Sequence, residues 1–172
     1  RRQLGVVLQD PFLFSGTIAD NIRFGRPEAT DEEVAEAARA IGVDRITARF
    51  ESGLDHVVRE GGSGLSAGER QLISIARALL ADPRILILDE ATSNIDRPSE
   101  ILIEQAFDTL LRGRTSVIIA HRLATVRRAD EILVIEKGRV TQRGTEAELL
   151  AEDGPFRRLA ETMHGMPVRD VA

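Results

Sequence analysis

The chain has 172 residues, of which 42% are hydrophobic and 30% are charged, a composition typical of a globular domain with its own core. No apolar run approaches the ~20 residues that a membrane-spanning helix needs. The net charge of −5 argues against a broad nucleic-acid-binding surface, and the lack of cysteine excludes disulfides and thiolate metal sites.

The first part of the chain predicts a strand over residues 4–8, which ends at Gln9. Residues 12–18 then form an apolar loop, followed by a short helix that continues to about Ile22. Phe12 and Phe14 lie in this loop. Composition alone favours core positions for these two side chains, and an exposed docking surface is the alternative.

The next segments predict helices. A capping box of Thr30 and Glu33 begins a helix over residues 30–41, and Gly42 ends it. We expect a shorter helix over residues 44–50 and a glycine-rich irregular segment over residues 53–64. A second capping box, formed by Ser66 and Glu69, begins a helix over residues 66–81.

The second half of the chain alternates strands with helices. Residues 85–88 are four large apolar residues in a row, which is typical of a parallel strand buried on both faces. Another buried strand is predicted over residues 115–120, after a helix over residues 98–111. The remaining predictions are a short helix at 123–128, a hairpin at 131–142, helices near 145–151 and 155–163, and a frayed tail from residue 165.

Polar residues follow three of the predicted strands. Gln9 follows the first, Asp89 and Glu90 the second, and His121 the third. Parallel strands bring such residues to one edge of a sheet, where α/β proteins bind their ligands. An acid here could hold Mg²⁺, its neighbour could act as a general base, and the histidine could donate to a phosphate oxygen. Solvated strand ends and a structural histidine are the alternatives.

The start of the helix at Ser66 is a second candidate site. Its free N–H groups and positive dipole end could bind a phosphate through Ser66, Ala67 and Gly68. The alternative is a plain capping box between Ser66 and Glu69. Capping alone would not require Gly68 in the first turn, where glycine weakens a helix.

Together these motifs resemble the nucleotide-binding domain of the ATP-binding cassette (ABC) proteins. Residues 65–69 resemble the signature motif, and residues 85–89 resemble the Walker B strand, with Glu90 as the catalytic glutamate. The resemblance extends to the Q-loop, D-loop and switch motifs: Gln9 (Q-loop), Ser93, Asn94, Ile95 and Asp96 (D-loop) and His121 (switch). All five motifs occur in the order found in the family.

The resemblance implies an ATP- and Mg²⁺-dependent ATPase that forms a head-to-tail dimer with a second nucleotide-binding domain. Catalysis is then expected from Glu90, His121 and Gln9, and metal binding from Asp89 and Gln9. The signature residues of one subunit contact the ATP of the other: Ser66, Ala67, Gly68 and Glu69.

Segments 14–22 and 53–60 resemble those that face the membrane domains in exporters, which makes a docking surface at Phe12 and Phe14 more plausible than composition alone does. An exporter's transmembrane domains are therefore an expected partner, nucleic acid is not, and the expected location is the cytoplasmic face of the cell membrane.

The expected fold is α/β: part of a P-loop NTPase (RecA-like) core with a mostly parallel sheet and an inserted α-helical subdomain. The expected parts are 1–10 (core strand and Q-loop), 11–82 (helical subdomain with the signature), 83–164 (the C-terminal half of the ATPase core) and 165–172 (a flexible tail).

Several residues depart from the family pattern. No Walker A pattern is present, Ala67 and Glu69 replace the usual Gly and Gln of the signature, and Arg59 stands where exporters often have Gly. We therefore expect the chain alone to be inactive. Without the part of the cassette that carries Walker A, strand edges and part of the core would also be left uncovered, so we expect the chain alone to self-associate. The alternative function is a degenerate or non-transport ABC ATPase that completes a partner's nucleotide site.

Overall fold

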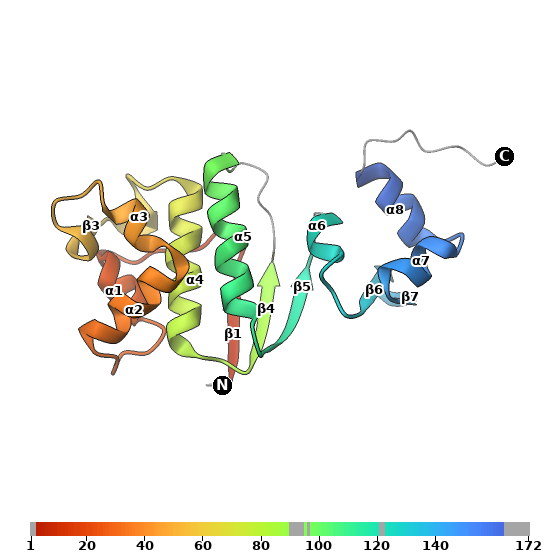
Figure 1. Ribbon diagram of the computed structural model, residues 1–172, viewed down its shortest axis with the longest axis horizontal. Helices are drawn as coiled ribbons and strands as arrows, with labels where there is room; N and C mark the ends of the chain where they lie inside the picture. Colours follow the sequence, from red (N-terminus) through yellow and green to blue (C-terminus); the bar gives the residue numbers. More distant parts are fainter. Residues whose placement is uncertain (1–2, 90–94, 96, 121–122, 164–172) are drawn as a thin grey trace. The chain divides into compact units, whose positions relative to one another are not determined.

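The computed structural model describes residues 3–89, 95, 97–120 and 123–163 (Figure 1). The chain divides into two compact units, with the boundary after Ile119. The first unit holds a parallel sheet and most of the helices. The second holds a hairpin and three short helices.

Three parallel strands form the sheet of the first unit, in the order β1-β4-β5. Their bounds are Leu4–Val7 for β1, Ile85–Asp89 for β4 and Thr115–Ile119 for β5. In the register, Leu88 lies beside Val7 on one side and Ile118 on the other. Because the strands run in one direction, their carboxyl ends meet at one edge of the sheet.

Two long helices, α4 (Ala67–Ala81) and α5 (Arg97–Leu111), pack side by side against this sheet (Figure 1). Leu86 and Leu88 of β4 lie on the face of the sheet that the two helices cover. They form one apolar core with Ile75 of α4 and Ile103 of α5. The predicted α/β class, the parallel sheet and both long helices are therefore confirmed.

The other face of the sheet is apolar but exposed. Its side chains have between 42% and 58% of their surface exposed: Leu4, Val6, Ile85, Val117 and Ile119. The prediction that the strands at 85–88 and 115–120 are buried on both faces is therefore wrong for the described part of the chain. An apolar run shows that both faces avoid water, but it does not show which element covers each face.

The segment between β1 and β4 is mainly helical. Before α4 it contains α1 (Ile18–Arg23), α2 (Asp31–Ile41) and α3 (Val43–Thr47). The predicted irregular stretch contains η1 (Gly53–Asp55), β3 (Val57–Val58) and η2 (Glu60–Gly62), and β3 pairs antiparallel with β2 (Gly16–Thr17). Two-residue strands leave no periodic signal, so this pairing could not be predicted. Helix α3 is shorter than the predicted 44–50.

Local hydrogen bonds explain why these helices begin and end where they do. At α2, the Thr30 hydroxyl accepts from the Glu33 backbone N–H, and the Glu33 carboxylate accepts from the Thr30 N–H at 2.8 Å. Gly42 ends the helix with a φ of +86°, which glycine adopts without strain. The predicted cap and helix end are both confirmed.

The second unit has its own small core. Its elements are α6 (Leu123–Val126), β6 (Ile132–Glu136), β7 (Arg139–Gly144), α7 (Glu146–Ala151) and α8 (Pro155–Met163). Strands β6 and β7 form the predicted hairpin, and Leu149 and Phe156 pack against it. Both C-terminal helices are confirmed, while α6 is shorter than the predicted 123–128.

Candidate functional site

The first candidate site lies at the carboxyl edge of the β1-β4-β5 sheet. Gln9 follows β1 and is exposed, whereas Asp89 ends β4 and is partly buried. Because Val7 lies beside Leu88 in the register, Gln9 and Asp89 stand at the same edge, on adjacent strands. The remaining predicted residues of this site and of the D-loop, Ile95 excepted, lie outside the described residues: Glu90, Ser93, Asn94, Asp96 and His121.

The second candidate site is the start of α4. The Ser66 hydroxyl accepts from the Glu69 N–H at 3.2 Å, and the Glu69 carboxylate accepts from the Ser66 N–H at 2.7 Å. The predicted capping box is therefore confirmed. Ser66 is exposed and Ala67 partly exposed, whereas Gly68 is buried. A ligand that approaches this helix end from solvent meets Ser66 and Ala67 first.

Gly68 is explained by packing within the chain. A Cβ on Gly68 would lie 2.7 Å from Cβ of Ser99 on α5 and 3.4 Å from Cγ2 of Ile95. Because the first distance is shorter than side chains tolerate, α5 could not lie this close to α4 with a larger residue at position 68. The glycine is therefore no independent sign of phosphate binding, although it brings the predicted D-loop residue Ile95 next to the signature.

The carboxylate of Glu69 has a second partner that the sequence did not reveal. Nη2 of Arg49 lies 2.9 Å from the same oxygen, Oε2, that accepts from Ser66. Only 10% of the Glu69 side chain is exposed, compared with 50% for Arg49. The two residues are 20 positions apart, and no local pattern links them.

Arg70 holds the glycine-rich loop before the signature. It donates from Nη1 to the Leu65 carbonyl at 2.9 Å, and a Cβ on Gly62 would lie 2.4 Å from Arg70 Cδ. Arg70 also forms a long ion pair, at 4.0 Å, with the exposed Asp10 beside Gln9. The loop, the signature helix and the end of β1 are therefore joined through one side chain.

An exposed aromatic cluster, made of Phe12, Phe14 and Phe24, lies on the helical segment. The ring centroids of Phe12 and Phe14 are 5.3 Å apart, and those of Phe14 and Phe24 are 4.5 Å apart. Between 42% and 59% of each residue is exposed, whereas Leu13 is fully buried. The core interpretation of Phe12 and Phe14 is therefore wrong, because Leu13 takes the core position in this loop.

Arg77 of α4 contacts the aromatic cluster and the backbone that carries it. Its guanidinium donates to the Asn21 carbonyl at 2.8 Å, to Asn21 Oδ1 at 3.1 Å and to the Phe12 carbonyl at 3.1 Å. It also lies 5.7 Å and 5.6 Å from the ring centroids of Phe14 and Phe24. Burial lowers the pKa of Arg77. Asn21 is itself buried and binds both backbone groups of Phe14, so side chains of α1 and α4 together hold the backbone of this loop.

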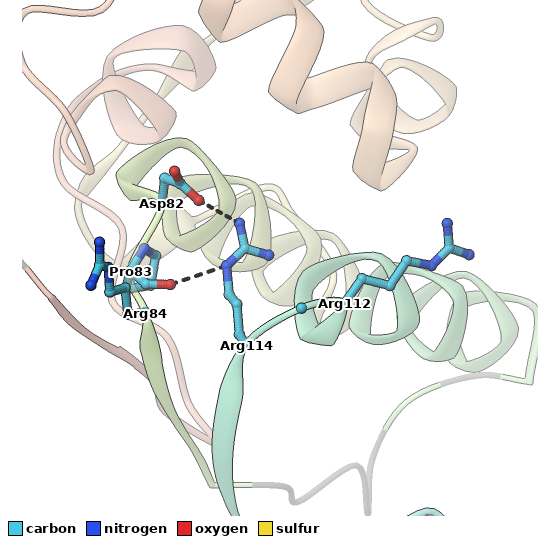
Figure 2. Close-up of a pocket in the computed structure, with 6 residues that line it drawn as sticks. Asp82, Pro83, Arg84, Arg112 and Arg114 are labelled. Carbon is cyan, nitrogen blue, oxygen red and sulfur yellow. Dashed lines mark hydrogen bonds and ion pairs between the residues drawn. The ribbon is translucent and has the colours of Figure 1, made fainter.

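A pocket of about 220 Å³ lies at the opposite edge of the sheet, where β4 and β5 begin (Figure 2). Arg114 donates to the Pro83 carbonyl at 3.1 Å and to the Asp82 carboxylate at 2.7 Å. Figure 2 shows the guanidinium groups of Arg84 and Arg112 pointing away from each other. Arg114 is thus already paired with Asp82, and the pocket lies away from both candidate sites.

Within the described residues, no three His, Cys, Asp or Glu side chains gather closely enough to hold a metal ion by themselves. Asp89 and Gln9 supply one carboxylate and one amide oxygen. That pair still suits Mg²⁺, which commonly takes one or two carboxylates and completes its shell with phosphates and water. In the part of the chain that the structure describes, no helix has the length and apolar character to cross a membrane.

Comparisons with known proteins identify the same family. The profile of the ABC transporter family matches residues 1–93, more than half of the chain. The chain is 53% identical over 168 residues to the uncharacterized ABC transporter ATP-binding protein YknV of Bacillus subtilis, covering 98% of this chain and 28% of that protein. It is 54% identical over 156 residues to a fatty acid ABC transporter ATP-binding/permease protein of Mycobacterium bovis, covering 91% of this chain and 25% of that protein.

A solved structure extends the agreement to the fold. A bacterial Atm1-family ABC exporter with ATP bound matches 100% of this chain and 29% of its own, with a TM-score of 0.85 and 38% identity. The chain thus spans less than a third of the length of each of these proteins. On the matching profile, the ordered motifs and the shared fold, the chain belongs to the ABC transporter family.

Proposed function

We propose that the chain is part of the nucleotide-binding domain of an ABC exporter, in which ATP hydrolysis drives transport across a membrane. One observation carries the proposal: adjacent parallel strands bring Gln9 and Asp89 to one edge of the sheet. Such an edge is where α/β sheets place their ligands. The ATP-binding/permease relatives and the ATP-bound exporter of similar fold support the same function.

Each motif then has a role in this domain. Asp89 and Gln9 would hold Mg²⁺, which neutralises phosphate charge when it is bound. Glu90 would orient and deprotonate the attacking water, with Gln9 helping to place that water, and His121 would donate to a phosphate oxygen. Residues 93–96 would form the D-loop between the two sites of a dimer.

The signature would act on the nucleotide held by a second nucleotide-binding domain. Ser66 and Ala67 stand at the solvent-facing start of α4, so they are placed to meet a phosphate first. Gly68 keeps α5 close behind them, and Glu69 closes the cap. This assignment requires a dimer, either of identical chains or of two different ones.

The aromatic cluster gives the proposed membrane partner a place to dock. Three exposed phenylalanine rings, held from beneath by Arg77, present apolar and aromatic surface that suits an apolar protein segment. We assign this surface to the transmembrane domains of the exporter. The protein would then work at the cytoplasmic face of the cell membrane.

Glu90→Gln in the whole protein, expressed from its complete gene, tests the proposal. We expect Mg-ATP turnover by the wild type and a loss of ~10² to 10⁴ in kcat, because a general base contributes about that factor. Glu104→Gln is the matched control, because Glu104 is exposed on α5, and it should leave turnover unchanged. A wild type that binds ATP without turnover would favour the degenerate cassette, and equal effects of both variants would refute the role of Glu90.

A further inference from the structure

The Glu69 carboxylate sits where a negative charge opposes the function proposed for the signature. It lies in the first turn of α4, two residues from Ala67, at the helix end that is assigned to a phosphate. A carboxylate there repels an anion, although the helix dipole stabilises the carboxylate itself. A signature that carries this acid therefore needs something to compensate its charge.

Arg49 supplies that compensation. Its Nη2 lies 2.9 Å from Oε2 of Glu69, and the same oxygen accepts from the Ser66 N–H at 2.7 Å. With a positive guanidinium and a backbone donor on one oxygen, the carboxylate is turned back onto its own cap. Charge-assisted hydrogen bonds of this kind are shorter and stronger than neutral ones.

Other contacts keep Arg49 in place. It follows α3 in the chain, its guanidinium lies 4.6 Å from the ring centroid of Phe50, and that ring stacks on His56 at 3.6 Å. Nη2 also reaches the Gly64 carbonyl at 3.5 Å, just before the signature. Arg49 therefore touches the segment on both sides of Ser66.

We propose that Arg49 is a positioning residue for the signature, which holds the Glu69 carboxylate on the Ser66 N–H and cancels its charge so that the start of α4 can accept a nucleotide phosphate. This inference rests on the proposed function. It adds a residue, outside the family motifs quoted above, on which nucleotide affinity depends. The ligand at the start of α4 would be the phosphate groups of the nucleotide held by the other domain of the dimer.

A double-mutant cycle on the whole protein, expressed from its complete gene, tests the inference. We expect Arg49→Gln to raise KM for ATP about two- to fivefold, the range typical of a partly exposed ion pair, while kcat changes less. It should also reduce the thermal shift produced by magnesium and a non-hydrolysable ATP analogue. In the Glu69→Gln background, Arg49→Gln should have no further effect on either measurement.

The cycle separates a charge effect from a structural one. Loss of the contacts of Arg49 with Phe50 and Gly64 would act whether or not Glu69 is charged, so an effect that persists in the Glu69→Gln background would overturn the inference. Arg45→Gln is the matched control, because it removes the same charge from an exposed position on α3. Wild-type turnover with an unaltered KM in Arg49→Gln would also overturn it, whereas a wild type without turnover or nucleotide shift would refute the proposed function instead.

Discussion

The helical segment, residues 12–81, and the β1-β4-β5 sheet differ in how completely they bury their apolar side chains. In the helical segment, Ile18, Ile22 and Val34 are almost fully enclosed by neighbouring helices. In the sheet, Leu86 is fully buried, whereas its neighbour Ile85 is 42% exposed. Both regions contribute to one apolar core, but the sheet buries only the face that the helices cover.

This difference shows that the sheet needs a further element to cover its second face, whereas the helical segment does not. Parallel sheets usually have helices on both faces, because each strand is apolar on both sides. The bare face contains Val6 of β1, Ile85 of β4 and Val117 and Ile119 of β5, which together form an apolar surface across the three strands. We expect a further element to cover this face in the whole protein.

Alanine substitutions at Leu86 and Ile85 test the comparison most strongly. Leu86→Ala should reduce the free energy of unfolding of the chain by ~2 to 5 kcal/mol, because it leaves a cavity in the core. Ile85→Ala on the bare face should reduce it by about 1 kcal/mol or less. Urea unfolding measures both. Equal losses would mean that Ile85 is as buried as Leu86, and the contrast between the two faces would then be false.

A substitution at Gly25 tests the packing of the helical segment at a very close contact with α4. A Cβ on Gly25 would lie 2.1 Å from the backbone oxygen of Arg77, which cannot move without shifting α4. We expect Gly25→Ala to cost ~3 kcal/mol, the upper end of overpacking effects. The loss should appear in urea unfolding together with altered NMR signals from the phenylalanine rings of the aromatic cluster, because Arg77 supports that cluster.

Gly53→Ala is the control for this variant. Gly53 has a φ of +55° and nothing within 4 Å of an added Cβ, so only the backbone conformation opposes the change. Its cost should be ~1 kcal/mol. If Gly25→Ala costs no more than Gly53→Ala, the turn at Gly25 has room to move away from α4, and the helical segment is less tightly packed than its burial indicates.

The features that could be predicted from the sequence are those that local chemistry decides. Thr30 with Glu33, and Ser66 with Glu69, form capping boxes over three residues, so both helix starts were predicted correctly. Gln9 and Asp89 could be placed at one edge because the carboxyl ends of parallel strands lie on the same side of the sheet. These inferences need no knowledge of distant contacts.

The features that could not be predicted depend on residues far apart in the chain. The guanidinium of Arg77 binds Asn21 across 56 positions, and Arg49 binds Glu69 across 20. The need for glycine at position 68 comes from the approach of Ser99, which depends on the packing of α5 against α4. Sequence patterns predict which side chains are apolar and avoid water, but only the packed fold shows which residues each side chain contacts.

The capping boxes give the smallest effect, and it depends on pH. The Thr30 N–H donates to the Glu33 carboxylate, which lowers the pKa of Glu33 below its ordinary value of 4.5, with a smaller contribution from Arg26. Because the pKa is lower in the folded than in the unfolded chain, ionised Glu33 stabilises the fold above about pH 4.5, and this contribution is lost as the pH falls through the folded value.

Glu33→Gln removes the charge, including its attraction to Arg26, while the amide can still accept from the Thr30 N–H. The difference in unfolding free energy between wild type and variant, measured by urea unfolding from pH 7 to pH 3, should be present near neutrality and shrink towards the acid end. Glu32→Gln removes the same charge from the same turn without touching the cap. If both variants behave alike, the effect belongs to the helix dipole and not to the hydrogen bond from Thr30, and the helical segment is stabilised by its charge pattern more than by its caps.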